Sequence, residues 1–208
     1  MDKENNMEEN IKLPEPQKTL GFPLMKAMAQ RRSIRKWKDA PVSMQDLSNL
    51  LWAACGVTKE KSGKTKSKRT IPSACNSQEI RVYVLLENGT FLYNEEKHEL
   101  VKILAKDIRE FIGTQKMMKR APMGLIYVAD LSRMTSPFVR GKEAQRFSAW
   151  VDTGYVSQNV YLYCTAAGLG TVALGLIDRE KLRKLMGLKE HEKIVLNQAV
   201  GYLLDSVS

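Results

Sequence analysis

Residues 152–175 read DTGYVSQNVYLYCTAAGLGTVALG and contain a change from one apolar pattern to another. Residues 143–167 lack proline, and apolar side chains occur nearly all round the helix that residues 156–167 would form. A helix that is apolar on every side is typical of a buried one. Gly168 is placed to end this helix, and a strand is expected over residues 171–177. We therefore expect the fold to be built round one long central helix.

The flanking sequence mixes helical and strand patterns in a way that indicates an α+β fold. Ser43 begins a capping-box sequence, and Asn88-Gly89 is typical of a tight hairpin turn. Helices are expected at 22–31, 43–56, 98–112 and 178–186, and strands at 81–86, 91–93, 124–129 and 194–204. With the central segment, this gives at least five helices and about five strands. We expect one sheet layer covered by helices.

The length of 208 residues favours one domain. Residues 1–20 are polar, contain Pro14 and Pro16, and show no apolar period. Such a composition is typical of a disordered N-terminal arm. The expected organisation is an arm over residues 1–20 and a single domain over residues 21–208.

The chain is basic, with 33 Lys+Arg against 23 Asp+Glu and a formal net charge of +10. Half of this excess lies in residues 59–69, KEKSGKTKSKR, which hold six basic side chains and one acid. The charge is consistent with an anionic partner, and a solvated surface loop explains the run equally well. The run contains no aromatic residue on which a base could stack. A nucleic acid is therefore not the favoured partner.

Cysteine and histidine are too few and too scattered to suggest a metal site or a Ser-His-Asp triad. Cys55, Cys75 and Cys164 lie far apart, and His98 and His191 both sit beside acids, as on a solvated helix face. No apolar run approaches the ~20 residues that span a bilayer, and the N-terminus has no apolar signal core. We expect a cytoplasmic protein that binds neither a membrane nor a metal.

Three short segments are candidates for ligand binding. In an extended chain Arg31, Ser33 and Arg35 would point the same way, which suits a phosphate; a solvated basic turn is the alternative. Residues 72–78, PSACNSQ, form either a ligand-reading loop or an ordinary turn. In residues 168–175 the glycines follow a helix, whereas a dinucleotide motif needs them before one. Gly175 would still let a flat ligand approach the backbone.

Taken in this order, the segments resemble the nitroreductase family of flavin enzymes over about residues 22–204. The sequence is most similar to small single-domain members related to the azole-forming peptide dehydrogenases. The resemblance rests on five pieces that occur in register: RRSIR, LSNLLWAACGV, RTIPSACNSQEIRVYVL, DTGYVSQNVYLYCTAAGLGTVALG and QAVGY.

The resemblance implies an α+β homodimer with a mixed, mainly antiparallel sheet flanked by helices, and one FMN in each of two interface sites. Arg31 and Ser33 would hold the FMN phosphate and ribityl chain, Arg32 would flank them, and Arg35 would lie near the pyrimidine edge. From the other subunit, the residues along the flavin would be Pro72, Ser73, Ala74 and Asn76. The backbone facing the ring near N5 would be that of Leu174, Gly175 and Leu176. The flexible wall over the flavin would include Phe138, Phe147 and Trp150, with a core position as the alternative for Trp150.

The implied activity is an NADH- or NADPH-driven, ping-pong reduction of a small acceptor such as a nitroaromatic or a quinone. No side chain would act as a catalytic acid or base, and Arg35 would stabilise the negative charge of reduced flavin. One alternative is a dehydrogenase or oxidase that acts on an organic substrate with oxygen as acceptor. Another is a non-enzymatic basic protein that binds nucleic acid.

The sequence departs from the family pattern at three places. No acid lies beside Leu174-Gly175-Leu176, and no base follows the closing strand in residues 203–208. Phosphate binding would then depend on the first arginine cluster, assisted by Arg69 or a lysine of residues 59–69. Gln78-Glu79-Ile80 also replaces the Gln-Pro-Trp common in nitroaromatic reducers.

Overall fold

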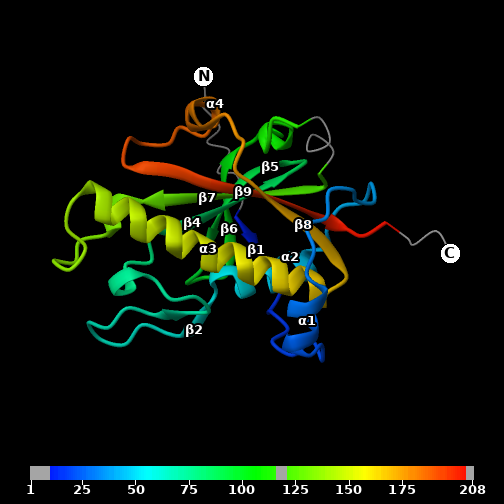
Figure 1. Ribbon diagram of the computed structural model, residues 1–208, viewed down its shortest axis with the longest axis horizontal. Helices are drawn as coiled ribbons and strands as arrows, with labels where there is room; N and C mark the ends of the chain where they lie inside the picture. Colours follow the sequence, from blue (N-terminus) through cyan, green and yellow to red (C-terminus); the bar gives the residue numbers. More distant parts are fainter. Residues whose placement is uncertain (1–9, 116–120, 205–208) are drawn as a thin grey trace, which may run out of the picture.

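The computed structural model describes residues 10–115 and 121–204, which form two sheets. The main sheet has seven strands, and every pair of neighbours in it is antiparallel (Figure 1). In order across the sheet the strands are β1 (Ile11–Lys12), β6 (Glu99–Leu104), β5 (Gly89–Asn94), β4 (Ile80–Leu86), β7 (Met123–Asp130), β9 (Glu192–Tyr202) and β8 (Leu169–Leu174). A separate hairpin pairs β2 (Val57–Lys59) with β3 (Lys68–Arg69). The predicted α+β fold with a mainly antiparallel sheet is confirmed.

Helices cover both faces of the main sheet. The described helices are α1 (Leu24–Gln30), α2 (Met44–Cys55), α3 (Lys142–Ala166) and α4 (Arg179–Leu185), with 3-10 turns η1 (Ala74–Asn76), η2 (Arg109–Phe111) and η4 (Leu131–Arg133). Alternate residues of β4 face opposite layers, because side chains alternate along a strand. Val82 and Val84 join the cluster that packs under α2 and α3, whereas Tyr83 and Leu85 join the cluster that contains residues of α4.

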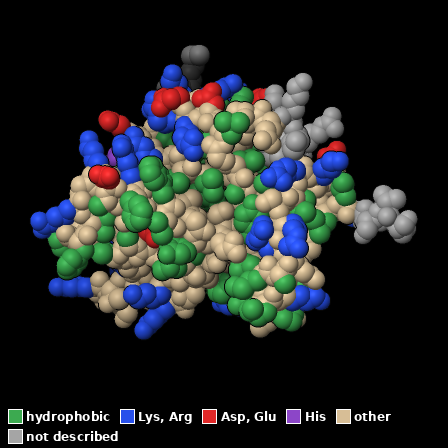
Figure 2. Space-filling view, in the orientation of Figure 1, with side chains coloured by type: hydrophobic (Ala, Val, Ile, Leu, Met, Phe, Trp, Pro, Cys, Tyr) green, Lys and Arg blue, Asp and Glu red, His purple; other side chains and the backbone are tan. Residues whose placement is uncertain are grey.

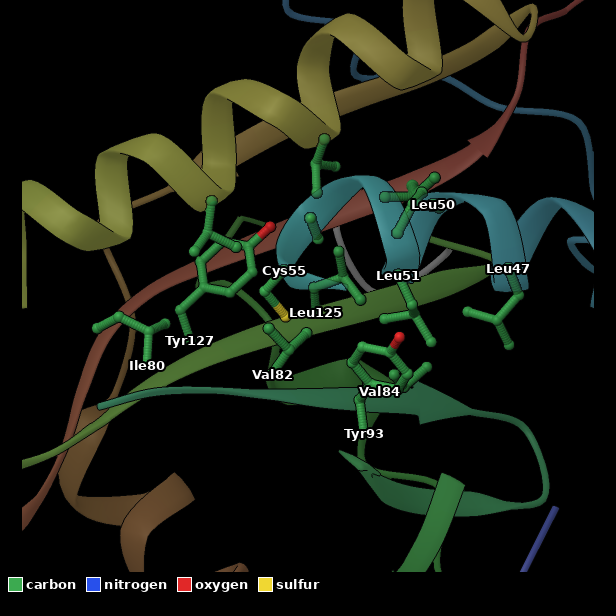
Figure 3. Packing of buried hydrophobic residues seen from close by; sticks show 14 of the residues in the cluster. Leu47, Leu50, Leu51, Cys55, Ile80, Val82, Val84, Tyr93, Leu125 and Tyr127 are labelled. Atoms are coloured by element: carbon green, nitrogen blue, oxygen red, sulfur yellow. The ribbon is translucent and has the colours of Figure 1, made fainter. Parts of the chain in front are cut away.

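Helix α2 forms where its capping sequence predicted it. Ser43 Oγ accepts a hydrogen bond from the main-chain N–H of Asp46 at 3.0 Å, which satisfies one free donor of the first turn. Leu47, Leu50 and Leu51 follow on one face and are fully or almost fully buried. Figure 3 shows this face of α2 packed over the strands of the sheet. Burying side chains of this size contributes up to about 1.5–3 kcal/mol each.

Helix α3 is the long helix predicted from residues 143–167, and Gly168 follows its end with a φ of +71°. The predicted burial on every side is wrong. Within residues 156–167, Val156, Val160 and Cys164 are fully buried, but Gln158 is exposed and Leu162 is only half-buried. Nearer the start of the helix, Phe147 and Trp150 expose 67% and 59% of their surface. A second apolar stripe of α3 thus has no cover within the described chain, and the sequence pattern could not separate this stripe from the core-facing one.

The prediction of a helix over residues 98–112 is wrong, because that segment contains the strand β6 followed by the 3-10 turn η2. Residues 99–104 form β6, which pairs with β5, and Leu100 of this strand is fully buried in the core. Cross-strand pairing outweighs the weak local preference of this segment for a helix. His98 precedes the strand, with a φ of +50°.

His98 does not lie on a solvated helix face as predicted. The Tyr93 hydroxyl lies 2.8 Å from Nδ1, and Ser48 Oγ lies 2.7 Å from Nε2. Because Ser48 Oγ gives its own proton to the Pro14 carbonyl, Nε2 is the donor in the second contact. Burial lowers the pKa of the half-buried His98, which favours its neutral imidazole form.

The described part of the expected N-terminal arm is packed on the domain, so the boundary at residue 21 is wrong. Ile11 pairs with Leu100 of β6, and Leu13 is buried in the main cluster. The main-chain N–H of Gln17 donates to Asn49 Oδ1 at 2.7 Å. The apolar residues at 11 and 13 are too few to give a period in sequence, yet they complete an edge of the sheet. Residues 1–9 lie outside the described residues.

The other differences concern element limits and numbers. The described chain has four α-helices and nine strands, against the five helices and five strands expected. Strand β8 ends at Leu174, three residues before its predicted end. Across residues 10–115 and 121–204, no helix is both long and apolar enough to cross a membrane.

Candidate functional site

The segment from Arg31 to Arg35, here called the arginine segment, runs beside β8 directly after α1. Ser33 forms an isolated parallel bridge with Thr171, and the main-chain N–H of Ile34 donates to the Thr171 carbonyl at 2.9 Å. The predicted extended conformation is therefore confirmed at Ser33. The bridge brings the arginine segment to the same edge of the sheet as residues 174–176.

Tyr161 of α3 joins the arginine segment to the end of β8. Its hydroxyl accepts a hydrogen bond from the main-chain N–H of Ala173 at 2.8 Å. The hydroxyl keeps its own proton, which it can donate to Ser33 Oγ at 3.1 Å. One tyrosine thus fixes two of the three segments predicted to bind a ligand.

The three arginines of the segment have different surroundings. The Arg31 guanidinium lies over the ring of Tyr161, 5.2 Å from its centroid, and Arg35 Nη1 donates weakly to the Ser33 carbonyl at 3.3 Å. Arg32 turns back and donates to the carbonyls of Ala29 and Arg31 at the end of α1. Among the described residues no carboxylate pairs with any of the three. Arg31 and Arg35 therefore keep most of their hydrogen-bonding capacity for an anion.

The backbone after β8 is open to a flat ligand. A Cβ atom added to Gly175 would meet no heavy atom within 4 Å, and the side chain of Leu176 is exposed. Arg179 holds this stretch by donating to the Gly175 carbonyl at 3.4 Å and to the carbonyls of Ile194 and Val195. The backbone at residues 174–176 thus forms an open surface at the edge of the sheet. Cavities of about 540 and 320 Å³ lie elsewhere, beside Trp52.

Residues 72–78, here called the 72–78 loop, have a strained backbone. Cys75, Asn76 and Gln78 take left-handed φ values of 51°, 52° and 54°. Such a conformation costs of order 1–3 kcal/mol for each residue other than glycine, and it persists only where neighbours impose it. Strain of this kind is common at ligand sites, which favours the ligand-reading interpretation over an ordinary turn.

Hydrogen bonds from three directions hold the 72–78 loop. Within it, Ser73 Oγ accepts from the main-chain N–H of Gln78 at 3.0 Å. From α3, Asp152 Oδ2 accepts from the main-chain N–H of Ala74 at 2.8 Å. From the hairpin, the Ser67 carbonyl accepts from the side-chain amides of Gln78 and Asn76 at 2.7 and 3.3 Å. The Asn76 amide therefore supports the loop through a contact within the same chain.

The arginine segment and the 72–78 loop are held at different points along α3. Tyr161 holds the first and Asp152 the second, and nine residues of helix separate these by about 13 Å. The third segment, at residues 174–176, lies with the arginine segment. The structure thus joins the arginine segment to residues 174–176 and leaves the 72–78 loop apart from both.

The predicted wall residues are all exposed. Phe138 lies in the loop before α3, and Phe147 and Trp150 lie on α3 itself. The alternative core position for Trp150 is wrong, as its 59% exposure shows. Figure 2 shows hydrophobic side chains gathered where α3 faces the viewer, and a second group over α1. Leu24, Met25 and Met28 are the exposed apolar residues of α1.

Arg69 cannot assist in phosphate binding, because it belongs to the protein interior. Its Nη1 lies 2.6 Å from Glu95 Oε1, and both side chains expose only 5% of their surface. The lysines of residues 59–69 are exposed on the β2–β3 hairpin, and Ser62 and Thr65 exchange main-chain hydrogen bonds across its tip. The run predicted as a loop is therefore a hairpin whose base is a buried ion pair.

Sequence reasoning missed Tyr161, Asp152 and Glu79. Tyr161 was hidden among the apolar residues of α3, where an aromatic side chain is no signal. Asp152 was detectable, because an acid in a largely apolar helix needs a partner when buried. Glu79 was noted only as a departure from the family pattern.

Comparison with known proteins finds one matching family model and several similar chains. A family model described as the nitroreductase family matches residues 28–202. A Methanocaldococcus jannaschii protein named as a nitroreductase is 32% identical over 179 residues, covering 81% of this chain and 86% of its own length. The crystal structure of a Ralstonia eutropha protein described as a nitroreductase has a TM-score of 0.86 and 35% identity, covering 97% of this chain and 92% of that chain. The FMN reductase (NAD(P)H) of Bacillus subtilis is 25% identical over 194 residues, covering 88% of this chain and 66% of its own length.

Proposed function

This chain belongs to the nitroreductase family of oxidoreductases, and we propose that it is a homodimeric, cytoplasmic enzyme that uses FMN and is reduced by NADH or NADPH. The observation that carries the proposal is the bond of Tyr161 to both Ser33 and Ala173. It joins the segment that carries the Ser33 hydroxyl and the Arg31 and Arg35 guanidinium groups to β8, which ends one residue before the open backbone at Gly175. The relative named FMN reductase (NAD(P)H) supports the use of flavin and nicotinamide.

The residues at the sheet edge fit the chemistry of FMN. Arg31 and Ser33 would hold the phosphate and the ribityl chain, because a guanidinium and a hydroxyl donate well to phosphate oxygens. Arg35 would lie at the pyrimidine edge, where its charge favours the negative reduced ring. Main-chain groups of Leu174, Gly175 and Leu176 would face the ring, since no side chain blocks Gly175.

Residues of the 72–78 loop would complete the site from the partner subunit. About 13 Å of α3 separates this loop from the arginine segment of its own protomer, which supports a site shared between two chains. Ser73 and Ala74 would pack along the ring, with Pro72 beside them, and Asn76 would support the loop. The exposed apolar stripes on α1 and α3 supply surface that a partner subunit would cover.

When bound, FMN would accept hydride from the nicotinamide and pass electrons to a second substrate such as a nitroaromatic or a quinone. The chain's own part is to bind, orient and charge-stabilise the cofactor. Arg31 and Ser33 would anchor one end of the cofactor, and Arg35 would supply positive charge where the reduced ring is negative. Phe138 and Phe147 would form an apolar wall for a flat acceptor.

The test is the visible absorption spectrum of the freshly purified protein, followed by titration with FMN. We expect flavin bands and a dimer on gel filtration. We also expect oxidation of NADH or NADPH with nitro or quinone acceptors, with ping-pong kinetics. A protein that stays colourless and does not bind added FMN would contradict the proposal.

The same assay separates the opposite direction of catalysis. A dehydrogenase or oxidase of organic substrates, as in the azole-forming relatives, would bind FMN but would not accept hydride from a nicotinamide. Gln78-Glu79-Ile80, in place of the sequence common in nitroaromatic reducers, keeps this second candidate in view. Reduction of bound flavin by NADH or NADPH under anaerobic conditions decides between the two.

A further inference from the structure

Glu79 is an acid in the protein interior directly before β4. Its side chain is fully buried, with 0% exposure, and among the described residues no donor of another residue forms a hydrogen bond to either carboxylate oxygen. Its main chain is in place, because the Glu79 carbonyl accepts from the main-chain N–H of Asp130 at 2.9 Å. An ionised carboxylate with no donor is strongly disfavoured in such surroundings. The position therefore calls for a neutral, protonated carboxyl group.

Asp152 is the group that faces Glu79. It exposes only 4% of its surface, and its carboxyl group lies within hydrogen-bonding reach of the Glu79 carboxyl. Two carboxylates cannot bond to each other, because both only accept; one of them must carry a proton. Asp152 Oδ2 already accepts from the Ala74 N–H at 2.8 Å. The pair therefore needs one shared proton, and burial raises the pKa of Glu79, which favours the protonated form of that carboxyl.

The charged groups around Glu79 and Asp152 do not reverse the preference of Glu79 for its protonated form. Burial and the neighbouring Asp152 raise the pKa of Glu79 to about 7, whereas the main-chain N–H of Glu79 and the Arg133 guanidinium of η4 oppose the rise. The charged groups that face Arg133 in turn are Arg81, Glu95, Arg69 and Asp130. Arg133 is therefore shared among several groups and does not form a dedicated ion pair with Glu79.

The 72–78 loop depends on this pair for its one bond to α3. Asp152 holds the Ala74 N–H, and the next residues, Cys75 and Asn76, have left-handed φ values. If the hold weakens, the stored strain favours relaxation of the loop. Whether Asp152 stays in position depends on whether Glu79 donates to it or repels it.

We propose that Glu79 and Asp152 are positioning residues that hold the 72–78 loop through one shared proton, so that the grip of the loop on its ligand weakens as the pH rises. The loosening of the loop with rising pH does not depend on which ligand binds. The weaker retention of FMN at higher pH rests on the function proposed above.

The direction of the effect follows from the two states of Glu79. Below its pKa in the folded protein, Glu79 donates to Asp152 and fixes the carboxylate that holds Ala74. Above it, two negative charges lie in contact within the interior, and like charges repel. An acid whose pKa is raised by folding also makes folding less favourable as the pH rises from about 4.5 toward about 7. Above that range the contribution of Glu79 to stability no longer changes.

The test compares hydrogen exchange of a peptide that covers residues 73–78 in the full-length wild type and in Glu79→Gln, measured at matched pH from 5.5 to 9. Glutamine has the size of glutamic acid, can donate to Asp152 and does not ionise. Because both proteins are compared at each pH, the intrinsic pH dependence of exchange cancels. We expect a rate ratio near one below pH 6 and at least about fivefold faster exchange in the wild type above pH 8. Asp152→Asn should also remove the pH response, since no pair of like charges arises.

FMN retention is the second measurement. We expect wild-type retention to fall as the pH rises through about 7 and Glu79→Gln retention to stay flat, with the exposed Glu110→Gln behaving like the wild type. A rate ratio near one at every pH, or an unchanged response in Glu79→Gln, would overturn the inference. A pH-dependent loop in a protein that binds no FMN would instead overturn the proposed function and leave the inference standing.

Discussion

The arginine segment and the 72–78 loop are both fixed to α3, but by opposite means. Tyr161 holds the first through a neutral hydroxyl, and the charges of that segment remain exposed on Arg31 and Arg35. A buried carboxylate, Asp152, holds the second, which has no charged side chain before Glu79. One region therefore keeps its charge for a ligand, whereas the other uses charge to keep its own backbone in place. Substitutions in the first should act directly on binding, and substitutions around the second should act on stability and, through the loop, on binding.

The largest expected effect is at the base of the hairpin that supports the 72–78 loop. Arg69→Met leaves Glu95 buried without its partner, and breaking such a pair costs about 3–5 kcal/mol. Urea unfolding measures the loss. The double variant Arg69→Met/Glu95→Leu removes both charges and should recover most of the stability. An equal loss in the single and double variants would show that packing, not charge, makes Arg69 necessary.

The next effect concerns the arginine segment and appears in binding. Arg31→Ala removes one charge-assisted contact to phosphate, worth about 1.5–3 kcal/mol, and should weaken FMN retention about tenfold to a hundredfold. Arg35→Ala should mainly lower the flavin reduction potential, because it removes positive charge near the reduced ring. Equilibrium binding and redox titration separate the two effects.

Arg32→Ala is the matched control for both arginine variants. The Arg32 side chain bonds carbonyls at the end of α1, so its loss should change retention much less than the loss of Arg31. Equal retention and an unchanged potential in Arg31→Ala and Arg35→Ala would refute the assignment of the arginine segment.

A smaller effect is expected at the tyrosine that joins the arginine segment to β8. Tyr161→Phe keeps the ring under Arg31 but leaves the Ala173 N–H without its acceptor, which should cost about 1 kcal/mol. FMN retention should fall only a fewfold. Tyr155→Phe, on the exposed side of the same helix, is the control. No loss in either variant would mean that the Ser33 bridge alone fixes the segment.

The smallest effect is expected at the tip of the hairpin. Lys64, Lys66 and Lys68 are exposed, so their joint replacement by glutamine should change the unfolding free energy by less than about 0.5 kcal/mol. FMN retention should not change. The triple variant also tests the nucleic-acid alternative, which would need these lysines because Arg69 is buried. Salt-dependent binding of a polynucleotide that disappears in this variant would revive that alternative.

The sequence predicted those element boundaries that depend on a short local motif, such as a helix cap or a tight turn. Ser43 and Asp46 predicted the start of α2, Asn88-Gly89 predicted the turn between β4 and β5, and Gly168 predicted the end of α3. Each of these effects acts within a few residues. Residues 99–104 were misassigned because their strand pairing is with β5, and a single segment does not show its partner. The same holds for Ile11, which becomes a strand only beside Leu100.

The candidate site was predictable where side-chain type alone indicates chemistry, as in the arginine segment. It was not predictable where function depends on a distant neighbour. Asp152 and Glu79 lie 73 positions apart in sequence, and nothing local indicates that they meet. Arg69 shows the converse, because its place in a basic run concealed a buried ion pair with Glu95.

The bridge between Ser33 and Thr171 has a second consequence, which concerns solubility. Strand β8 is the last strand of the main sheet, and a bare edge strand offers unpaired main-chain groups to strands of other molecules. The arginine segment covers part of that edge, with charged residues on either side of Ser33. The residues proposed to hold a cofactor therefore also guard the sheet against edge-to-edge aggregation, so a variant that releases them should be prone to precipitate as well as slow to bind.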